Sequence, residues 1–226
     1  IKNIIFDFAG VIVHCPYEEF IKRAFPQLAQ AEDVAQLADL IFKSEVWSQY
    51  DKGLPYEELQ KQLVDLLRQA DHECDLENID RLMQARKDLM LPFEDTLLLI
   101  KQLNSMNLNI FGLTNMPKEF FDHLTESIDI FKLFSGIVSS CYTGLVKPEK
   151  AIYERLLDQY QLRAEESIFI DDRAINLTPA KDLGIHTLLF VHAEQARELL
   201  NKHLDVDLGQ VMSPDYSRSE RRREVA

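Results

Sequence analysis

Long apolar runs are missing from this sequence of 226 residues. No stretch approaches the roughly 18 consecutive apolar residues that a membrane-spanning helix requires. The most apolar stretch near the start, residues 4–13, contains Asp7 and follows no basic leader, which argues against a secretory signal peptide. We therefore expect no membrane partner.

Basic residues and cysteines are also scarce. The sequence has 25 lysines and arginines against 38 aspartates and glutamates, a net charge of −13. Because nucleic-acid-binding proteins normally carry a basic surplus, this balance disfavours a nucleic-acid partner. Cys15, Cys74 and Cys141 form no Cys-x-x-Cys pair. Their odd number and wide spacing favour reduced thiols in the cytoplasm over a disulfide framework.

The composition that remains is that of a globular protein, with 46% hydrophobic and 28% charged residues. No internal repeat is visible. At about 150 residues per domain, the length predicts one domain or one domain with an insertion.

Short apolar segments alternate with helical patterns along most of the chain. The predicted strands lie at residues 4–8, 108–114, 136–139, 167–171 and 186–191. These runs do not alternate between apolar and polar residues, so we expect strands buried on both faces. Ile152, Leu156 and Tyr160 form a helical stripe, and Pro148 is expected at the first position of that helix. Strands alternating with helices predict an α/β fold with a doubly wound parallel sheet.

One region interrupts this alternation. Residues 15–89 show no good strand pattern, and helices are expected at 20–24, 34–47 and 56–70. We therefore predict an α/β core at 1–14 and 90–212 with an all-helical cap at 15–89. Residues 213–226, which include three consecutive arginines, are expected to form a flexible tail.

Polar side chains stand where the predicted strands end, and ligands of open parallel sheets bind at that edge. Asp7 stands at the end of the first strand, Thr114 and Asn115 end the second, and Asp171 and Asp172 end the fourth. Lys147 precedes the helix expected at Pro148. Clustered carboxylates attract a divalent cation such as Mg²⁺, and a lysine with a hydroxyl can hold an anion. This set predicts phosphoryl transfer with an aspartate nucleophile.

The same residues resemble the haloacid dehalogenase superfamily, most of whose members are Mg²⁺-dependent phosphatases with a helical cap. The matching segments are residues 7–12 (DFAGVI), 113–115 (LTN), 147–148 (KP) and 169–176 (FIDDRAIN), in the order that the family shows. The last segment is most similar to a subgroup with sugar-phosphate phosphatases and the phosphatase domain of soluble epoxide hydrolase.

The resemblance implies a Mg²⁺ site and its ligands. Asp7 would bind the metal, Ala9 would offer its backbone carbonyl, and Asp172 would be the ligand from the acidic loop. Asp171 would be a second ligand or would bind through water. Asn176 would orient the loop that carries these aspartates.

The resemblance also implies how phosphate is held. Asp7 would be the nucleophile, and Thr114 with the backbone at Asn115 would bind phosphate oxygens. Lys147 would neutralise charge between Asp7 and the phosphate. The sequence thus predicts a cytoplasmic hydrolase of a small phosphomonoester, with sugar phosphates as a candidate class, acting through an aspartyl-phosphate.

The sequence departs from the family at Ala9. Phosphatases of the family usually have a second aspartate there, which protonates the leaving oxygen and then activates water. Losing a general acid/base typically costs about 10²–10⁴ in rate. A substrate hydroxyl, water or a cap residue would have to replace it. The alternatives are a catalytically degenerate binding protein, or chemistry like that of dehalogenases or phosphonoacetaldehyde hydrolases, the latter through a cap lysine (Lys22, Lys43, Lys52 or Lys61).

Other residues of the cap are expected to be structural. Trp47 and Tyr50 are interpreted as core packing, with pocket lining as the alternative. Asp51 and Glu45 are interpreted as solvated charges at helix ends. His14 follows the first strand and is a weaker candidate for supplying a proton.

Overall fold

The computed structural model describes residues 1–28, 30–204 and 208, and confirms the predicted fold class. Five strands form one sheet in the order β3-β2-β1-β4-β5, and every neighbouring pair is parallel. The strands are β1 (Asn3–Phe6), β2 (Asn109–Thr114), β3 (Phe134–Ser139), β4 (Ser167–Asp171) and β5 (His186–Leu189). The order places β1, β2 and β4 side by side at the centre of the sheet.

The register of the central strands determines where the polar residues meet. Phe6 of β1 lies opposite Gly112 of β2 and Ile170 of β4. The residues that follow these positions therefore emerge at one edge, the carboxyl edge of the sheet. Asp7, Thr114 and Asp171 come together for this reason.

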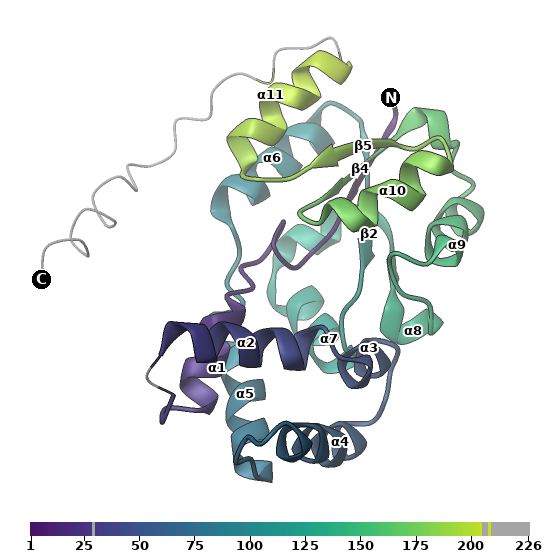
Figure 1. Ribbon diagram of the computed structural model, residues 1–226. Coiled ribbons are helices and arrows are strands. Elements are labelled where there is room, and N and C mark those ends of the chain that lie inside the picture. The colour runs from purple at the N-terminus through teal and green to yellow at the C-terminus, as the bar shows by residue number, and fades with distance from the viewer. Residues whose placement is uncertain (29, 205–207, 209–226) are drawn as a thin grey trace, which may run out of the picture.

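Helices cover both faces of the sheet, which gives two apolar clusters. Ile4 and Phe6 pack into one cluster and Ile5 into the other, because successive strand residues point to opposite faces. Figure 1 shows α6 and α11 on one side of the sheet and α9 and α10 on the other. The core helices are α6 (Glu94–Ser105), α7 (Lys118–Ser127), α8 (Ser140–Thr143), α9 (Lys150–Tyr160), α10 (Ala174–Asp182) and α11 (Ala193–Leu204), with 3₁₀ turns η1 (Asp129–Leu133) and η2 (Ala164–Glu166).

The segment between β1 and α6 forms a helical cap, as expected. Its helices are α1 (Tyr17–Ala24), α2 (Ala31–Phe42), α3 (Glu45–Asp51), α4 (Tyr56–Gln69) and α5 (Leu76–Leu89). The cap helices lie together below the sheet in Figure 1, next to α7 and α8. They bury apolar residues such as Phe20, Leu37 and Leu63 against one another. The proposed division at residues 14/15 and 89/90 agrees with this arrangement and stays a prediction.

Two local expectations were wrong. The single helix expected at 34–47 is divided into α2 and α3, because the Ser44 hydroxyl accepts a 3.0 Å hydrogen bond from the Trp47 backbone N–H and starts a new helix. Pro148 is not the first residue of a helix, since α9 begins at Lys150. Lys147 therefore lies in a loop rather than at a helix end.

The C-terminal part of the chain has few described residues. The proposed flexible tail at 213–226 lies outside them, as do 205–207 and 209–212 of the predicted core. Among the described residues, none of the helices combines the length and apolar character needed to cross a bilayer.

Candidate active site at the carboxyl edge of the sheet

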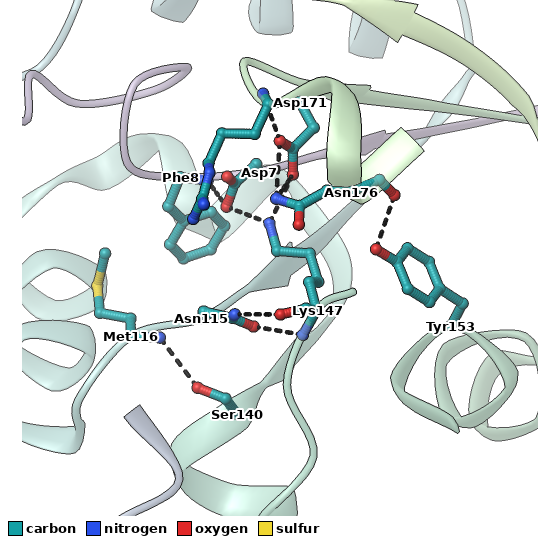
Figure 2. Close-up of polar contacts among 10 residues, drawn as sticks. Asp7, Phe8, Asn115, Met116, Ser140, Lys147, Tyr153, Asp171 and Asn176 are labelled. Carbon is teal, nitrogen blue, oxygen red and sulfur yellow. Dashed lines mark hydrogen bonds and ion pairs between the residues drawn. The ribbon is translucent and has the colours of Figure 1, made fainter. Parts of the chain in front are cut away.

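A buried lysine connects two buried aspartates at the carboxyl edge. Lys147 Nζ lies 2.8 Å from Asp7 Oδ1 and 2.7 Å from Asp171 Oδ2. Figure 2 shows the amine between the two carboxylates. All three side chains are at least nine-tenths buried. Burial alone would lower the pKa of Lys147, but the charges of Asp7 and Asp171 more than offset it, so the pKa is raised and the amine stays protonated.

Asp7 is oriented by the backbone around it. Its own N–H donates to the carbonyl of Ile170, and the Phe8 N–H donates to Asp7 Oδ1 at 2.6 Å. Burial raises the pKa of the Asp7 carboxyl to about 7, and Lys147 acts against this rise. Positive charge at this position therefore favours the ionised form of Asp7, which is the form that a nucleophile requires.

Asp171 is fully engaged by hydrogen bonds. Asn176 Nδ2 lies 3.0 Å from each of its carboxylate oxygens, and the Arg173 N–H donates to Oδ1 at 2.8 Å. Tyr153 in turn donates to the carbonyl of Asn176 at 2.7 Å. Lys147 contacts Oδ2 of the same carboxylate. Asp171 therefore holds both the lysine and the start of α10 in position.

Asp172 differs from Asp171 because it is exposed and packs against a glycine. Gly10 has φ +85°, and a Cβ built on it would lie 2.7 Å from Cγ of Asp172. Any side chain at position 10 would therefore push Asp172 away. The carboxyl group itself is partly buried, and this burial, followed by the charge of Asp171, raises the pKa of Asp172. This is the response of a carboxylate held near others of its kind.

The three carboxylates fit a divalent cation. Asp7, Asp171 and Asp172 each offer an oxygen, and these oxygens lie within 4.8 Å of one another. Ala9 and Gly10 border the cavity beside them. A set of hard oxygen donors on a fixed backbone turn suits Mg²⁺.

The predicted phosphate-binding residues take two different roles. The Thr114 hydroxyl is buried and has no hydrogen-bond partner among the described residues. A buried hydroxyl normally donates to an acceptor. The Thr114 hydroxyl can therefore donate to an oxygen of a bound ligand. The Asn115 amide instead donates to the Lys147 carbonyl at 2.9 Å and accepts from the Lys147 N–H at 2.8 Å. This side chain holds the lysine loop in place.

A cavity of about 230 Å³ opens over Asp7, Asn115, Lys147 and Asp172, while Thr114 and Asp171 are not among its lining residues. Its floor is formed by the core, with Asp7, Lys147 and Asp172. The remaining wall comes from the cap, with the lining residues Cys15, Tyr17, Ala38, Asp39, Phe42, Lys43, Trp47, Asp51 and Arg86. The site is thus built jointly by both parts of the chain.

Sequence reasoning missed Arg86, a buried charged residue of this wall. Arg86 is 4% exposed, and its guanidinium carbon lies 4.9 Å from the Trp47 ring centroid and 4.3 Å from that of Phe120. Its Nε and Nη1 have no hydrogen-bond partner within the described part of the chain. A signal was available, because Arg86 continues the apolar stripe of Ile79, Leu82 and Met83 at helical spacing. An arginine in an apolar stripe either forms an ion pair with a carboxylate or faces a ligand.

Asp51 was interpreted wrongly as a solvated charge. It is only partly exposed and lines the cavity at the end of α3. Trp47 is buried, as expected for a core residue, and it also borders the cavity. Tyr50 is buried and donates a hydrogen bond to Glu119 of α7. His14 is exposed, stacks on Phe93 and is not one of the lining residues.

Comparison with known proteins agrees with this geometry. The family model of haloacid dehalogenase-like hydrolases matches residues 1–184. Drimenol cyclase drtB of Aspergillus calidoustus is 29% identical over 163 residues, which are 70% of this chain and 30% of that protein. Sesquiterpene phosphatase astK of Aspergillus oryzae is 27% identical over 187 residues, or 81% of this chain and 87% of that protein. The chain therefore spans less than a third of the first relative but most of the second.

A solved structure shows the same fold. A HAD family enzyme of Bacteroides thetaiotaomicron in a magnesium complex superposes with a TM-score of 0.68 at 20% identity, covering 88% of this chain and 98% of that one. The match to the family model covers more than half of the chain and includes all four motif segments. The chain belongs to the haloacid dehalogenase-like hydrolases.

Proposed function

We propose that this hydrolase cleaves small phosphomonoesters with Asp7 as the nucleophile. The observation that carries the proposal is the buried Asp7–Lys147–Asp171 arrangement beside a third carboxylate, on the floor of a cavity. Asp7 would attack phosphorus and form an aspartyl-phosphate, which water then hydrolyses. The name of sesquiterpene phosphatase astK supports phosphomonoester chemistry.

We propose Mg²⁺ as the cofactor, held by Asp7, Asp172 and the carbonyl of Ala9. When bound, it would neutralise charge on the transferring phosphoryl group. Asp171 would act by fixing Lys147, since its oxygens already accept hydrogen bonds from Asn176 and Arg173. The magnesium complex of the Bacteroides enzyme supports this choice of metal.

Positive charge in the cavity favours an anionic substrate. The chain as a whole has a net charge of −13, so the site must create its own attraction for phosphate. Lys147, Arg86 and Arg173 all line the cavity. Thr114 adds a hydroxyl with no partner among the described residues, which we assign to a phosphate oxygen.

The cap wall favours a small organic group with an apolar surface. Tyr17, Phe42 and Trp47 contribute aromatic faces, and the cavity of about 230 Å³ admits a small molecule. A compact isoprenoid phosphate has such a surface throughout, whereas a short sugar phosphate has it only on the C–H faces of the sugar. The name of astK favours the second class, and the substrate panel decides between them.

The other chemistries considered from the sequence find less support. Each of Lys22, Lys43, Lys52 and Lys61 forms an ion pair with a carboxylate, whereas a Schiff-base lysine has to be uncharged. The intact charge cluster does not favour a degenerate binding protein, and the carboxylate pair of Asp171 and Asp172 speaks against metal-free dehalogenation.

The experiment is phosphate release from a panel of phosphomonoesters with Mg²⁺, using the wild type, Asp7→Asn and a control, Asp65→Asn. Asp65 is exposed on α4 and far from the motif residues in the sequence. We expect release that requires metal, is abolished by EDTA, persists in Asp65→Asn and is lost in Asp7→Asn. Turnover retained by Asp7→Asn would refute the assignment of the nucleophile.

A further inference from the structure

Proton transfer is the one part of the proposed reaction for which the core has no evident group. Ala9 has only a methyl side chain at the position where the family usually has an aspartate. Lys147 is held by two carboxylates, and Asp171 accepts hydrogen bonds on both oxygens. Neither group is free to exchange a proton with a leaving oxygen or a water molecule. The cap is the other wall of the cavity and is where such a group should be sought.

The end of α3 is attached to the core by three polar contacts. Tyr50 donates a hydrogen bond to Glu119, and Lys52 Nζ lies 3.0 Å from Glu149 Oε1. The Ser140 hydroxyl donates to the backbone carbonyl of Asp51 at 2.6 Å. Three consecutive residues are therefore connected to three different parts of the core, namely α7, α8 and the residue before α9. Asp51 lies at the centre of these contacts.

Ser140 ties this segment to the phosphate-binding loop as well. Its hydroxyl accepts a 3.0 Å hydrogen bond from the N–H of Met116, two residues after Thr114 (Figure 2). One side chain thus fixes both the loop at the end of β2 and the backbone of Asp51. Both hydrogen bonds hold the Asp51 backbone close to this loop.

The Asp51 carboxyl borders the same cavity as Asp7 and Lys147. No hydrogen bond or ion pair within the described residues engages it, although it is only partly exposed. Burial raises the pKa of this carboxyl to about 7, against the positive charges of Arg86, Lys147 and Arg173. A general acid that must later act as a base works best with a pKa near the working pH.

Other groups that line the cavity are poorer proton donors. Burial raises the pKa values of Tyr17 and Cys15 above values that are already high for such a role. Asp39 is ion-paired with Lys43 on the exposed side of α2. Charged and polar groups of several neighbouring elements face Asp51. They are Tyr17 from α1, Arg86 from α5, Ser140 from α8, and Lys147 and Arg173 from core loops.

We propose that Asp51 is the general acid and base of this hydrolase, a proposal that rests on the phosphatase function above. As the Asp7 oxygen bonds to phosphorus and the ester P–O bond breaks, protonated Asp51 gives its proton to the leaving oxygen, and a neutral alcohol departs. The Asp51 carboxylate then takes a proton from the water that attacks phosphorus. The bond to Asp7 breaks, inorganic phosphate leaves, and Asp51 is again protonated.

The test uses leaving groups that differ in their need for a proton. An alkyl phosphate must leave as an alcohol, whereas p-nitrophenol is acidic enough to leave as the anion. We compare kcat/KM on an alkyl phosphate and on p-nitrophenyl phosphate for the wild type, Asp51→Asn and a control on the same helix, Glu45→Gln, whose side chain is exposed. Activity that Asp51→Asn retains on p-nitrophenyl phosphate also shows that the variant is folded.

We expect Asp51→Asn to lose about 10²–10⁴-fold on the alkyl phosphate and less than about tenfold on p-nitrophenyl phosphate. Glu45→Gln should match the wild type on both. Adding Ala9→Asp to Asp51→Asn should restore part of the alkyl phosphatase activity, since an acid then stands at the family's usual position.

Equal losses on the two substrates, no loss on either, or no rescue by Ala9→Asp would overturn the role of Asp51 and leave the phosphatase function intact. If Asp51→Asn melts well below the wild type, Asp51→Ser is measured in the same way. A wild type that releases phosphate from neither ester would refute the proposed function itself, and the inference with it.

Discussion

The two walls of the cavity differ in how their buried cations are paired. In the core, Lys147 lies between Asp7 and Asp171, and Asn176 saturates the remaining oxygen positions of Asp171. In the cap, Arg86 is equally buried, but two of its nitrogens have no partner among the described residues. One cation completes a network, and the other stacks between the rings of Trp47 and Phe120.

The core groups are therefore fixed in position before the substrate binds, whereas two nitrogens of Arg86 in the cap, unpartnered among the described residues, gain a partner only when the substrate binds. A saturated network in a low-dielectric interior holds its geometry rigidly, which suits a nucleophile and its counter-ion. An unpaired buried cation is costly until an anion enters. The comparison therefore predicts that equivalent substitutions will have different effects in the two walls.

The largest effect is expected from Lys147→Met, which removes the cation of the core network. Two buried carboxylates would then face each other without compensation, and breaking a buried ion pair in this way typically costs about 3–5 kcal/mol. We expect a fall of that size in the free energy of unfolding, with loss of turnover, in urea denaturation and phosphate-release assays. A stability loss below about 1 kcal/mol would show that the network does not hold the site.

Asn176→Ala tests the support beneath that network. The substitution removes both hydrogen bonds to Asp171, and hydrogen bonds to charged groups contribute about 1.5–3 kcal/mol. We expect a destabilisation of about 2 kcal/mol and a 10–100-fold loss of kcat, since Lys147 loses its orientation. Asn109→Ala is the control, because it removes a 3.0 Å hydrogen bond to Asn3 at the opposite edge of the sheet. If both variants lowered kcat equally, the effect would not be specific to the site.

Gly10→Ala should weaken Mg²⁺ binding, while its melting temperature should resemble that of a control with the same backbone strain. A side chain at φ +85° costs about 1–2 kcal/mol, and here it also displaces Asp172. Gly144→Ala has the matched strain, φ +69°, with no atom within 4 Å of the new Cβ. We expect similar melting temperatures for the two variants, while only Gly10→Ala needs about tenfold more Mg²⁺ for half-maximal activity. An unchanged Mg²⁺ requirement would remove Asp172 from the metal site.

Arg86→Met should have the smallest effect on stability. Because Nε and Nη1 of the arginine have no hydrogen-bond partner in the described part of the chain, its replacement by an apolar side chain of similar length should change the unfolding free energy by less than about 1 kcal/mol. KM for a phosphomonoester should rise by about tenfold or more, since the cavity loses positive charge. A destabilisation as large as that of Lys147→Met would mean that the two walls do not differ.

Three of the four motifs could be placed from sequence because each lies at the end of a short buried strand. In a parallel sheet with β1 at the centre, these ends meet at one edge whatever the details of packing, so Asp7, Thr114 and Asp171 had to be neighbours. Lys147 reaches Asp7 and Asp171 from the loop before α9. The roles within the cluster were less accessible. That the Asn115 amide holds the backbone of Lys147 depends on the path of a loop, which no motif specifies.

The cap side of the site could not be predicted in the same way. Asp51 ends a helix whose start at Ser44 was missed, and its entry into the cavity depends on the hydrogen bond from Ser140, 89 residues away. Arg86 could have been noticed as a charge in an apolar stripe, but its facing Trp47 and Phe120 follows from how the cap packs onto α7. Tertiary contacts of this length leave little trace in local pattern.

The central claim is that Asp7 carries the phosphoryl group during turnover. The most direct measurement mixes the enzyme with a good phosphomonoester substrate, quenches with acid within milliseconds and maps the peptides by mass spectrometry. We predict one phosphoryl group on the peptide that contains Asp7, in larger amount for Asp51→Asn acting on p-nitrophenyl phosphate, because hydrolysis of the intermediate is then slowed. An unmodified Asp7 peptide at every quench time, in an enzyme that releases phosphate, would contradict the account.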